Sequence, residues 1–142
     1  MTWLEPSLAG AFVLVADQVG KELVLARLPP RPPRAPIPFL SIRWVLNRRG
    51  LAAGLIAKRA LVPLWIVLVA ASVWMLHAGI LGEGILGPIG IGAVLGGAAG
   101  NLLDQLRRGA IVDFIEIGPW PAFNLADAAI VGGIGLVLWS MY

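Results

Sequence analysis

Residues 61–76 read LVPLWIVLVAASVWML, a continuous apolar run with no charged side chain. A helix needs roughly 20 predominantly apolar residues to cross the hydrocarbon core of a bilayer, and this run approaches that length. Across the whole chain, 58% of the residues are hydrophobic and 13% are charged. Water-soluble domains usually contain about 25% charged residues. The chain has too little polar surface to cover a globule in water, so we expect it to fold in a lipid bilayer.

Three other segments approach the length of a membrane-spanning helix, although polar residues interrupt them. We therefore predict a single polytopic membrane domain, residues 1–142, whose four helices span residues 7–28, 60–77, 83–103 and 123–142. The third helix carries Gly92, Gly96 and Gly100 at four-residue spacing. Small residues repeated in this way let helix backbones approach closely in lipid. We expect this helix to pack tightly against its neighbours.

The connections between the predicted helices also have recognisable patterns. Residues 29–38 (PPRPPRAPIP) contain too many prolines for a helix or a central strand and should be extended. Residues 39–47 (FLSIRWVLN) alternate loosely and are rich in β-formers, so we predict one or two short strands at the membrane surface. Residues 107–122 join the third and fourth helices, and their Pro119-Trp120-Pro121 sequence suits an interfacial turn.

The composition excludes several kinds of site. There is no cysteine, so neither a disulfide framework nor a thiolate metal site is possible, and a single histidine, His77, rules out a His-rich cluster. The basic charge balance of so apolar a chain indicates contacts with a membrane surface before contacts with nucleic acid. We expect no metal, no nucleic-acid partner and a monomer.

Ionisable residues inside the predicted spans indicate a structural or functional role, because burying a charge in hydrocarbon is costly. Four carboxylates lie within or at the ends of these spans: Asp17, Asp104, Asp113 and Asp127. Asn101 lies three residues before Asp104, and Asn124 lies three residues before Asp127. Residues three apart share one face of a helix. Two helices therefore present an amide and a carboxylate on a common stripe, and we expect these groups to meet at one membrane face.

The chemistry open to such a group is narrow. The sequence contains no cysteine nucleophile, no Gly-rich phosphate loop and no metal-ligand spacing. Two carboxylates that share a proton can activate water, one as base and the other as acid, because like charges a few ångströms apart do not both ionise easily. Nearby asparagine side chains could orient the carboxylates or donate to a developing oxyanion. Ion transport along the same polar stripe is an alternative.

Each polar group also has a purely structural interpretation. Asp17 and Lys21, four residues apart, could form a buried ion pair that lets the first helix enter lipid. Asp104 could form a salt bridge at the helix end with Arg107 or Arg108.

The same holds for the acids nearer the fourth helix. Asp113 could be an exposed loop acid, and Asp127 could form an N-cap arrangement with Asn124. From the residues alone, these alternatives stay open beside a catalytic pair.

Two runs of the chain resemble a known family. Residues 96–117 (GGAAGNLLDQLRRGAIVDFIEI) and 121–130 (PAFNLADAAI) resemble the bacterial lipoprotein signal peptidase family, also called signal peptidase II, with its G-N-x-x-D-R, V-D-F and F-N-x-A-D motifs. Asp17-Gln18 with Lys21 resembles the D-Q-x-x-K motif of that family. Asn47 stands where the family has the asparagine of N-x-G-A-A-F. The resemblance runs from the first helix to the fourth.

This resemblance implies both a fold and a function. The expected fold is an all-α membrane protein, a four-transmembrane-helix bundle with a small extracytoplasmic β-cradle between helices 1 and 2. The implied activity is an aspartic endopeptidase without metal or cofactor. It removes signal peptides from prolipoproteins, cutting just before a cysteine that carries diacylglycerol, and membrane lipids surround it. Asp113 and Asp127 match the catalytic dyad. Other family positions match Asn101, Asp104, Asn124, Asn47, Asp17 and Lys21.

Three departures from the family pattern favour a second hypothesis, a non-catalytic paralogue that binds lipoproteins or lipids. Gln105 replaces the arginine of the D-R pair, which removes a charged, multi-donor partner for Asp104 or for substrate. Around Asn47 the sequence is NRRGLAAG, without the phenylalanine of the family motif. The stretch from Asp113 to Asp127 also looks short for a loop that covers a bound peptide.

The distribution of basic residues conflicts with the orientation that the family implies. All eleven lysines and arginines lie between Lys21 and Arg59 or at Arg107 and Arg108. The positive-inside rule would place both long connections in the cytoplasm. The resemblance implies the reverse: a multi-pass protein of the bacterial cytoplasmic (inner) membrane with its site on the extracytoplasmic side. We adopt that orientation, because extracytoplasmic substrates must reach the site, and expect the arginines of the long connection to bind anionic headgroups.

Overall fold

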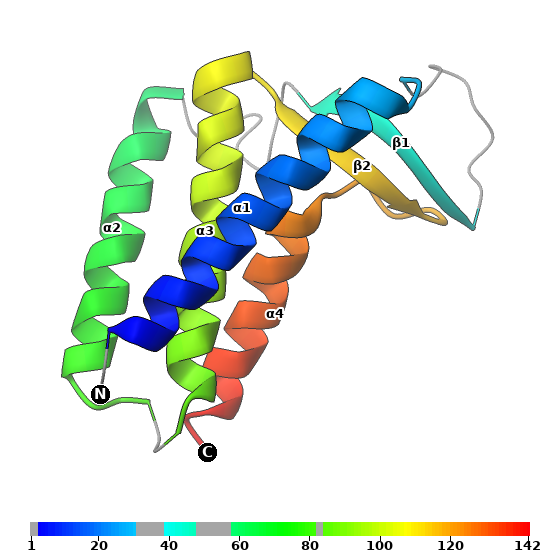
Figure 1. The fold of residues 1–142 in the computed structure, drawn as a ribbon. Coiled ribbons are helices and arrows are strands. Elements are labelled where there is room, and N and C mark those ends of the chain that lie inside the picture. Colours follow the sequence, from blue (N-terminus) through cyan, green and yellow to red (C-terminus); the bar gives the residue numbers. More distant parts are fainter. Residues whose placement is uncertain (1–2, 31–38, 48–57, 82–83) are drawn as a thin grey trace.

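The computed structural model describes residues 3–30, 39–47, 58–81 and 84–142. Figure 1 shows how its helices and strands are arranged. Their order along the chain is α1 (Leu4–Arg27), β1 (Leu40–Asn47), α2 (Lys58–His77), α3 (Leu86–Arg108), β2 (Ile111–Ile117) and α4 (Leu125–Trp139). The four predicted helices are present. Most of the segment 29–38, predicted to be extended, lies outside the described residues.

Helix α3 continues five residues beyond its predicted end, to Arg108. The prediction ended this glycine-rich segment at residue 103. In the structure Asn101 and Asp104 are buried among protein groups, so the helix can continue past them. It ends at Gly109, whose φ of 68° is the left-handed conformation that commonly stops a helix.

The strand expected between α1 and α2 forms, but its partner comes from elsewhere. Strand β1 pairs antiparallel with β2, which lies between α3 and α4, so placing the whole β-cradle between the first two helices was wrong. A strand needs a partner for its backbone N–H and C=O groups. The alternating segment Ile111–Ile117 supplies that partner once α3 has carried the chain to the same end of the bundle (Figure 1).

The register of the sheet places the end of β1 beside the start of β2. Leu40 pairs with Ile117 and Asn47 with Ile111, with an irregularity between Ile42 and Val45. Backbone hydrogen bonds of Ile115 with Phe123 hold β2 to the segment just before α4. The end of β1 and the start of β2 consequently lie beside the first turn of α4.

Glycines on α3 let α1 approach its backbone closely. A Cβ atom on Gly92 would lie 2.2 Å from the carbonyl oxygen of Pro6, and one on Gly96 would lie 2.3 Å from the carbonyl oxygen of Gly10. Real Cβ atoms do not come so near to backbone oxygens, so only glycine fits at either position. The close packing predicted from the glycine spacing is confirmed.

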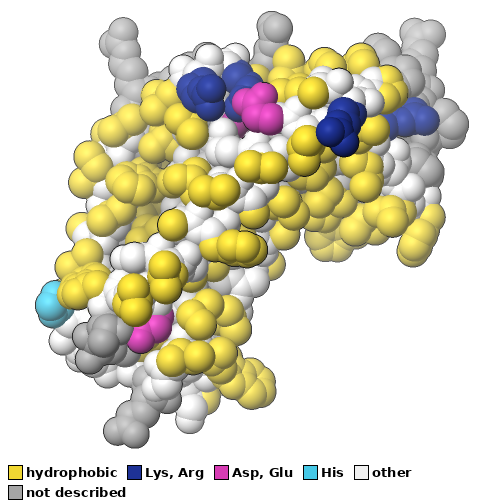
Figure 2. All heavy atoms as spheres, viewed as in Figure 1, with side chains coloured by type: hydrophobic (Ala, Val, Ile, Leu, Met, Phe, Trp, Pro, Cys, Tyr) yellow, Lys and Arg dark blue, Asp and Glu magenta, His cyan; other side chains and the backbone are white. Residues whose placement is uncertain are grey.

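The outer surface of the helices is largely apolar. Figure 2 shows hydrophobic side chains over the helices, with lysine and arginine gathered at the end that carries the sheet. Large apolar side chains of α1, such as Phe12 and Val15, are 74% and 60% exposed. Among the described residues, helix Leu86–Arg108 is long and apolar enough to cross a membrane, and the apolar helices Val62–His77 and Leu125–Trp139 are shorter.

The contact between α1 and α3 gives a testable prediction. We expect Gly96→Ala to lower the free energy of unfolding in detergent by about 1–3 kcal/mol, because the added methyl group must push α1 away from α3. Gly135→Ala on α4 is the matched control, since a Cβ atom there meets nothing within 4 Å. Equal stability of the two variants would show that the glycine contact does not hold α1 in place.

Candidate active site

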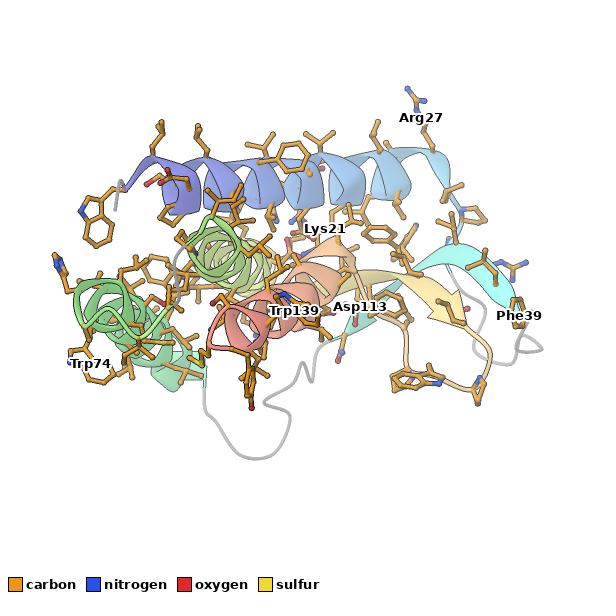
Figure 3. All side chains as sticks on the ribbon, turned by 90° about the horizontal axis from the view of Figure 1, so that it is seen from below. Lys21, Arg27, Phe39, Trp74, Asp113 and Trp139 are labelled. Atoms are coloured by element: carbon orange, nitrogen blue, oxygen red, sulfur yellow. The ribbon has the colours of Figure 1, made fainter. Side chains whose placement is uncertain are left out.

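Five elements place polar side chains at the end of the bundle where the sheet lies. Helix α1 contributes Asp17 and Lys21, and α3 contributes Asn101 and Asp104. Strand β1 contributes Asn47, β2 contributes Asp113, and the start of α4 contributes Asn124 and Asp127. In Figure 3, Lys21 points from α1 toward the other helices and Asp113 lies nearby on β2, whereas Arg27 of the same helix points away. The structure thus brings all eight residues singled out in the sequence to one region.

Lys21 lies at the centre of this region and is completely buried. Its Nζ atom lies 2.7 Å from Oδ2 of Asp17, 2.8 Å from Oδ2 of Asp104 and 3.1 Å from Oδ1 of Asn101. An ammonium group has three donors, and here each has an acceptor. The predicted ion pair between Asp17 and Lys21 is confirmed, and the charge on Lys21 also joins α1 to α3.

Asp17 also connects α1 to the start of α4. Its Oδ1 atom accepts a hydrogen bond of 3.0 Å from the backbone N–H of Ala126, in the first turn of α4. A carboxylate is favourable there, because the first N–H groups of a helix have no partner within it. Gly100 makes room for this carboxylate, since a Cβ atom at that position would lie 2.6 Å from Oδ2 of Asp17.

Asp104 is completely buried and has several donors besides Lys21. Arg108 Nη1 donates to its Oδ1 atom at 2.5 Å, and the backbone N–H of Val112 donates to its Oδ2 atom at 3.2 Å. Gln18 Nε2 donates to Oδ1 at 3.3 Å. The predicted salt bridge at the helix end is confirmed for Arg108. A guanidinium group therefore does reach Asp104, although residue 105 is not an arginine.

Asn101 connects Lys21 to one of the two candidate catalytic acids. Its Oδ1 atom accepts hydrogen bonds from Lys21 and, at 3.0 Å, from Nδ2 of Asn124. Its Nδ2 atom donates to Oδ1 of Asp127 at 2.8 Å. Because two donors bind the oxygen of the Asn101 amide, its nitrogen must face Asp127.

Asn124 caps α4 and also binds β2. Its Oδ1 atom accepts from the backbone N–H of Asp127 at 2.9 Å, while Oδ2 of Asp127 accepts from the backbone N–H of Asn124 at 3.3 Å. This reciprocal pair is a capping box, which confirms the predicted N-cap arrangement. In addition, Nδ2 of Asn124 donates to Oδ1 of Asp113 at 2.9 Å. One side chain thus ties together α4 and the strand that carries Asp113.

Asp113 is a buried strand residue, so the alternative of an exposed loop acid was wrong. Pairing of β1 with β2 brings Nδ2 of Asn47 to 3.0 Å from its Oδ2 atom. Burial raises the pKa of Asp113 from 3.8 to about 6. The hydrogen bond from Asn47 lowers this pKa, and the negative charge of Asp127 raises it. Asn124 donates hydrogen bonds to both Asp113 and Asp127, so the two acids belong to one network.

This arrangement suits acid–base chemistry on a water molecule. Asp113, whose pKa is about 6, can hold or release a proton near neutral pH. An amide N–H on one oxygen of each acid fixes its orientation, as general acid–base catalysis requires. In the part of the chain that the structure describes, no group of three or more His, Asp or Glu side chains could hold a metal ion.

Comparison with known proteins identifies the family. The sequence model of Signal peptidase (SPase) II matches residues 9–142. The chain belongs to the signal peptidase II family. The lipoprotein signal peptidase of Mycobacterium avium (strain 104) is 37% identical over 93% of this chain and 76% of its own length. That of Moorella thermoacetica is 35% identical over 94% of this chain and 90% of its own length. The family predicted from the sequence motifs is confirmed, and this member is a peptidase by family.

Two solved structures of bacterial membrane enzymes have a similar fold. One has a TM-score of 0.80 and 25% sequence identity, and covers 96% of this chain and 86% of its own. The other has a TM-score of 0.78 and 26% identity, and covers 96% of this chain and 91% of its own. The mostly helical fold with a small sheet is therefore shared with bacterial membrane enzymes of known structure.

Sequence reasoning missed several groups that complete the site. It gave no individual role to Gln18, which donates to Asp104 and also to Asp17. It also missed the backbone N–H groups of Val112 and Ala126, which bind the two buried carboxylates. Backbone donors carry no sequence signal of their own. The motif D-Q-x-x-K could have pointed to Gln18, because it lies beside Asp17 and one turn from Lys21.

Proposed function

We propose that the chain is an aspartic endopeptidase that removes signal peptides from prolipoproteins whose cysteine carries diacylglycerol. Membership of the signal peptidase II family supports the removal of lipoprotein signal peptides. The observation that supports the aspartic mechanism is that Asn124 hydrogen-bonds both acids: its Nδ2 atom donates to Oδ1 of Asp113, and its backbone N–H donates to Oδ2 of Asp127. Asn101 and Asn124 hold the two acids through hydrogen bonds.

In the proposed mechanism, one aspartate removes a proton from water and the other donates a proton to the oxygen of the scissile carbonyl. The hydroxide adds to the carbonyl carbon. The first aspartate then gives the proton that it took from water to the nitrogen, and the C–N bond breaks as one hydroxyl of the intermediate returns a proton to the second aspartate. The signal peptide keeps the new carboxyl group, and the amine leaves on the lipidated cysteine. The raised pKa of Asp113 suits it to hold the shared proton at the start of the cycle.

Binding of substrate is proposed to rest mainly on apolar contact. A diacylglyceryl group and a signal-peptide helix both lie in lipid and offer little polar surface to recognise. Exposed apolar side chains cover the helices of the enzyme, including Val67 on α2 and Val131 on α4, which are 62% and 72% exposed. Such contacts distinguish substrates weakly, because apolar burial is non-directional.

Two of the three departures from the family pattern, those at Gln105 and after Asn47, do not remove groups that the dyad needs. Arg108 supplies a guanidinium to Asp104 in the absence of an arginine at residue 105. Asn47 donates to Asp113 despite the altered sequence that follows it. These contacts favour an active peptidase over a paralogue that binds lipoproteins without cutting them.

We further propose that residues 1–142 form one domain with four spans in the bacterial cytoplasmic membrane, with the dyad on the extracytoplasmic side. The exposed apolar surface of the helices supports the spans. The orientation rests on the location of the substrates and opposes the positive-inside rule. Arg27 in the last turn of α1 and Arg43 on β1 would then contact anionic headgroups of the outer leaflet.

Reporter fusions test this orientation. A fusion after Trp120, between β2 and α4, should report an extracytoplasmic location, and one after Gly79, between α2 and α3, should report the cytoplasm. The two sites lie at opposite ends of the helices, so each serves as the control for the other (Figure 1). A cytoplasmic signal after Trp120 would count against the proposed activity, because the dyad would face away from its substrates.

Replacing either catalytic acid tests the mechanism. Asp113→Asn and Asp127→Asn should each lower the rate of cleavage of a purified diacylglyceryl-modified prolipoprotein by roughly 10²–10⁴-fold, because each removes a group that transfers a proton. Thermal unfolding should show that both variants still fold. Glu116→Gln is the matched control, since this acid lies on the same strand, three residues from Asp113. Near-normal cleavage by either asparagine variant would refute the dyad.

A further inference from the structure

Three charged residues, Asp17, Lys21 and Asp104, form a fully buried cluster. Arg108, in the last turn of α3, binds this cluster and is itself partly exposed. Its Nη1 atom lies 2.5 Å from Oδ1 of Asp104, and its Nη2 atom forms an ion pair with Glu22 of α1. The side chain of Arg108 is 19% exposed, whereas that of Asp104 is fully buried. Arg107, its neighbour in sequence, is exposed. Two adjacent arginines with the same charge thus occupy different environments.

The charges of the buried cluster balance only when Arg108 is included. Asp17, Lys21 and Asp104 are each completely buried. Two carboxylates and one ammonium leave one uncompensated negative charge, which is strongly unfavourable away from water. The guanidinium of Arg108 supplies the missing positive charge. Glu22 is 58% exposed, so water and salt screen its charge.

Asp104 supports both candidate catalytic acids. Its Oδ2 atom binds Lys21, which binds Asn101, and Asn101 donates to Asp127.

The same oxygen accepts from the backbone N–H of Val112, the residue before Asp113. The position of the Asp104 carboxylate therefore affects the hydrogen bonds that orient one acid and the strand that carries the other.

We infer that Arg108 is a positioning residue of the peptidase: it balances the charge of Asp104 and fixes that carboxylate, which in turn holds the supports of Asp113 and Asp127. The inference rests on the proposed function for its role in cleavage. It assigns to residue 108, one helical turn after Asp104, a task that residue 105 cannot perform in this chain, because Gln105 carries no charge and its Nε2 atom donates to the carbonyl oxygen of Gly109.

Loss of Arg108 should also change the ionisation of Asp113. Among the described residues, Lys21 from α1 lowers the pKa of Asp113 through its charge, and Asp127 from α4 raises it. The carboxylates of Asp17 and Asp104 lie beyond Lys21, on α1 and α3. Without the guanidinium, the negative charge of Asp104 is less compensated, so the pKa of Asp113 should rise above its value of about 6.

Three variants and two measurements test the inference. Cleavage of a diacylglyceryl-modified prolipoprotein gives kcat/KM, and infrared spectroscopy follows the carboxyl band of Asp113, identified by its absence in Asp113→Asn. Arg108→Met should lower kcat/KM on the order of 10²-fold, as displaced catalytic groups do, and should raise the pKa of Asp113. Arg108→Lys should keep kcat/KM and the pKa of Asp113 close to their wild-type values, because it keeps the positive charge. Arg107→Met, which removes the same charge from the exposed neighbour, should behave as wild type.

The outcomes separate this inference from the proposed function. An inactive wild-type enzyme refutes the function, while the infrared titration still decides the role of Arg108. If Arg108→Met matches Arg107→Met in cleavage and titration, the inference is overturned. It is also overturned if cleavage falls while the pKa of Asp113 stays unchanged, because Arg108 would then have only a structural role. Should Arg108→Met not fold, a shifted pKa of Asp113 in a folded Arg108→Lys would contradict the inference.

Discussion

The ammonium group of Lys21 carries a positive charge into the space between α1 and α3, where three acceptors surround it. A buried charge without partners is strongly destabilising, so Lys21 constrains every group that it touches. Asp17 on its own helix and Asp104 on α3 supply the opposite charge. Because the two carboxylates come from different helices, the ion pairs fix the position of α1 against α3. The glycines of α3 allow that approach by leaving its surface free of side chains.

The candidate active site follows from this constraint. Lys21 occupies the oxygen of Asn101, so the nitrogen of the amide is directed at Asp127. Asp17 binds the start of α4 through Ala126, and Asp104 binds the start of β2 through Val112. The three helices and two strands that carry the polar groups therefore meet where the buried charges are. A peptidase in lipid needs such internal partners, since the bilayer core offers no water to satisfy its polar groups.

Much of this arrangement was predictable from local sequence. Continuous apolar runs predict the helices, and residues four apart predict the ion pair between Asp17 and Lys21. The short spacing of Asn124 and Asp127 predicts the capping box. These features depend on residues within one helical turn, so their geometry is the same in any fold.

Contacts between distant parts of the chain were harder to predict. The pairing of β1 with β2 joins segments separated by two helices, and β1 gives no indication of which strand it will meet. Arg107 and Arg108 both lie within one turn of Asp104, so the sequence does not show which of them binds it. In the folded protein Arg108 also forms an ion pair with Glu22 of α1. Burial of Asp113, and with it the raised pKa, depends on the same tertiary contacts.

The most direct test of this account measures the stability of Lys21→Met with and without Asp17→Asn. Unfolding in detergent should show that Lys21→Met loses about 3–5 kcal/mol, because it leaves buried carboxylates uncompensated. Adding Asp17→Asn should restore part of that loss by removing one of those charges. If Lys21→Met is as stable as the wild type, or if the second substitution makes it still less stable, the buried charge does not organise the fold and the site as described.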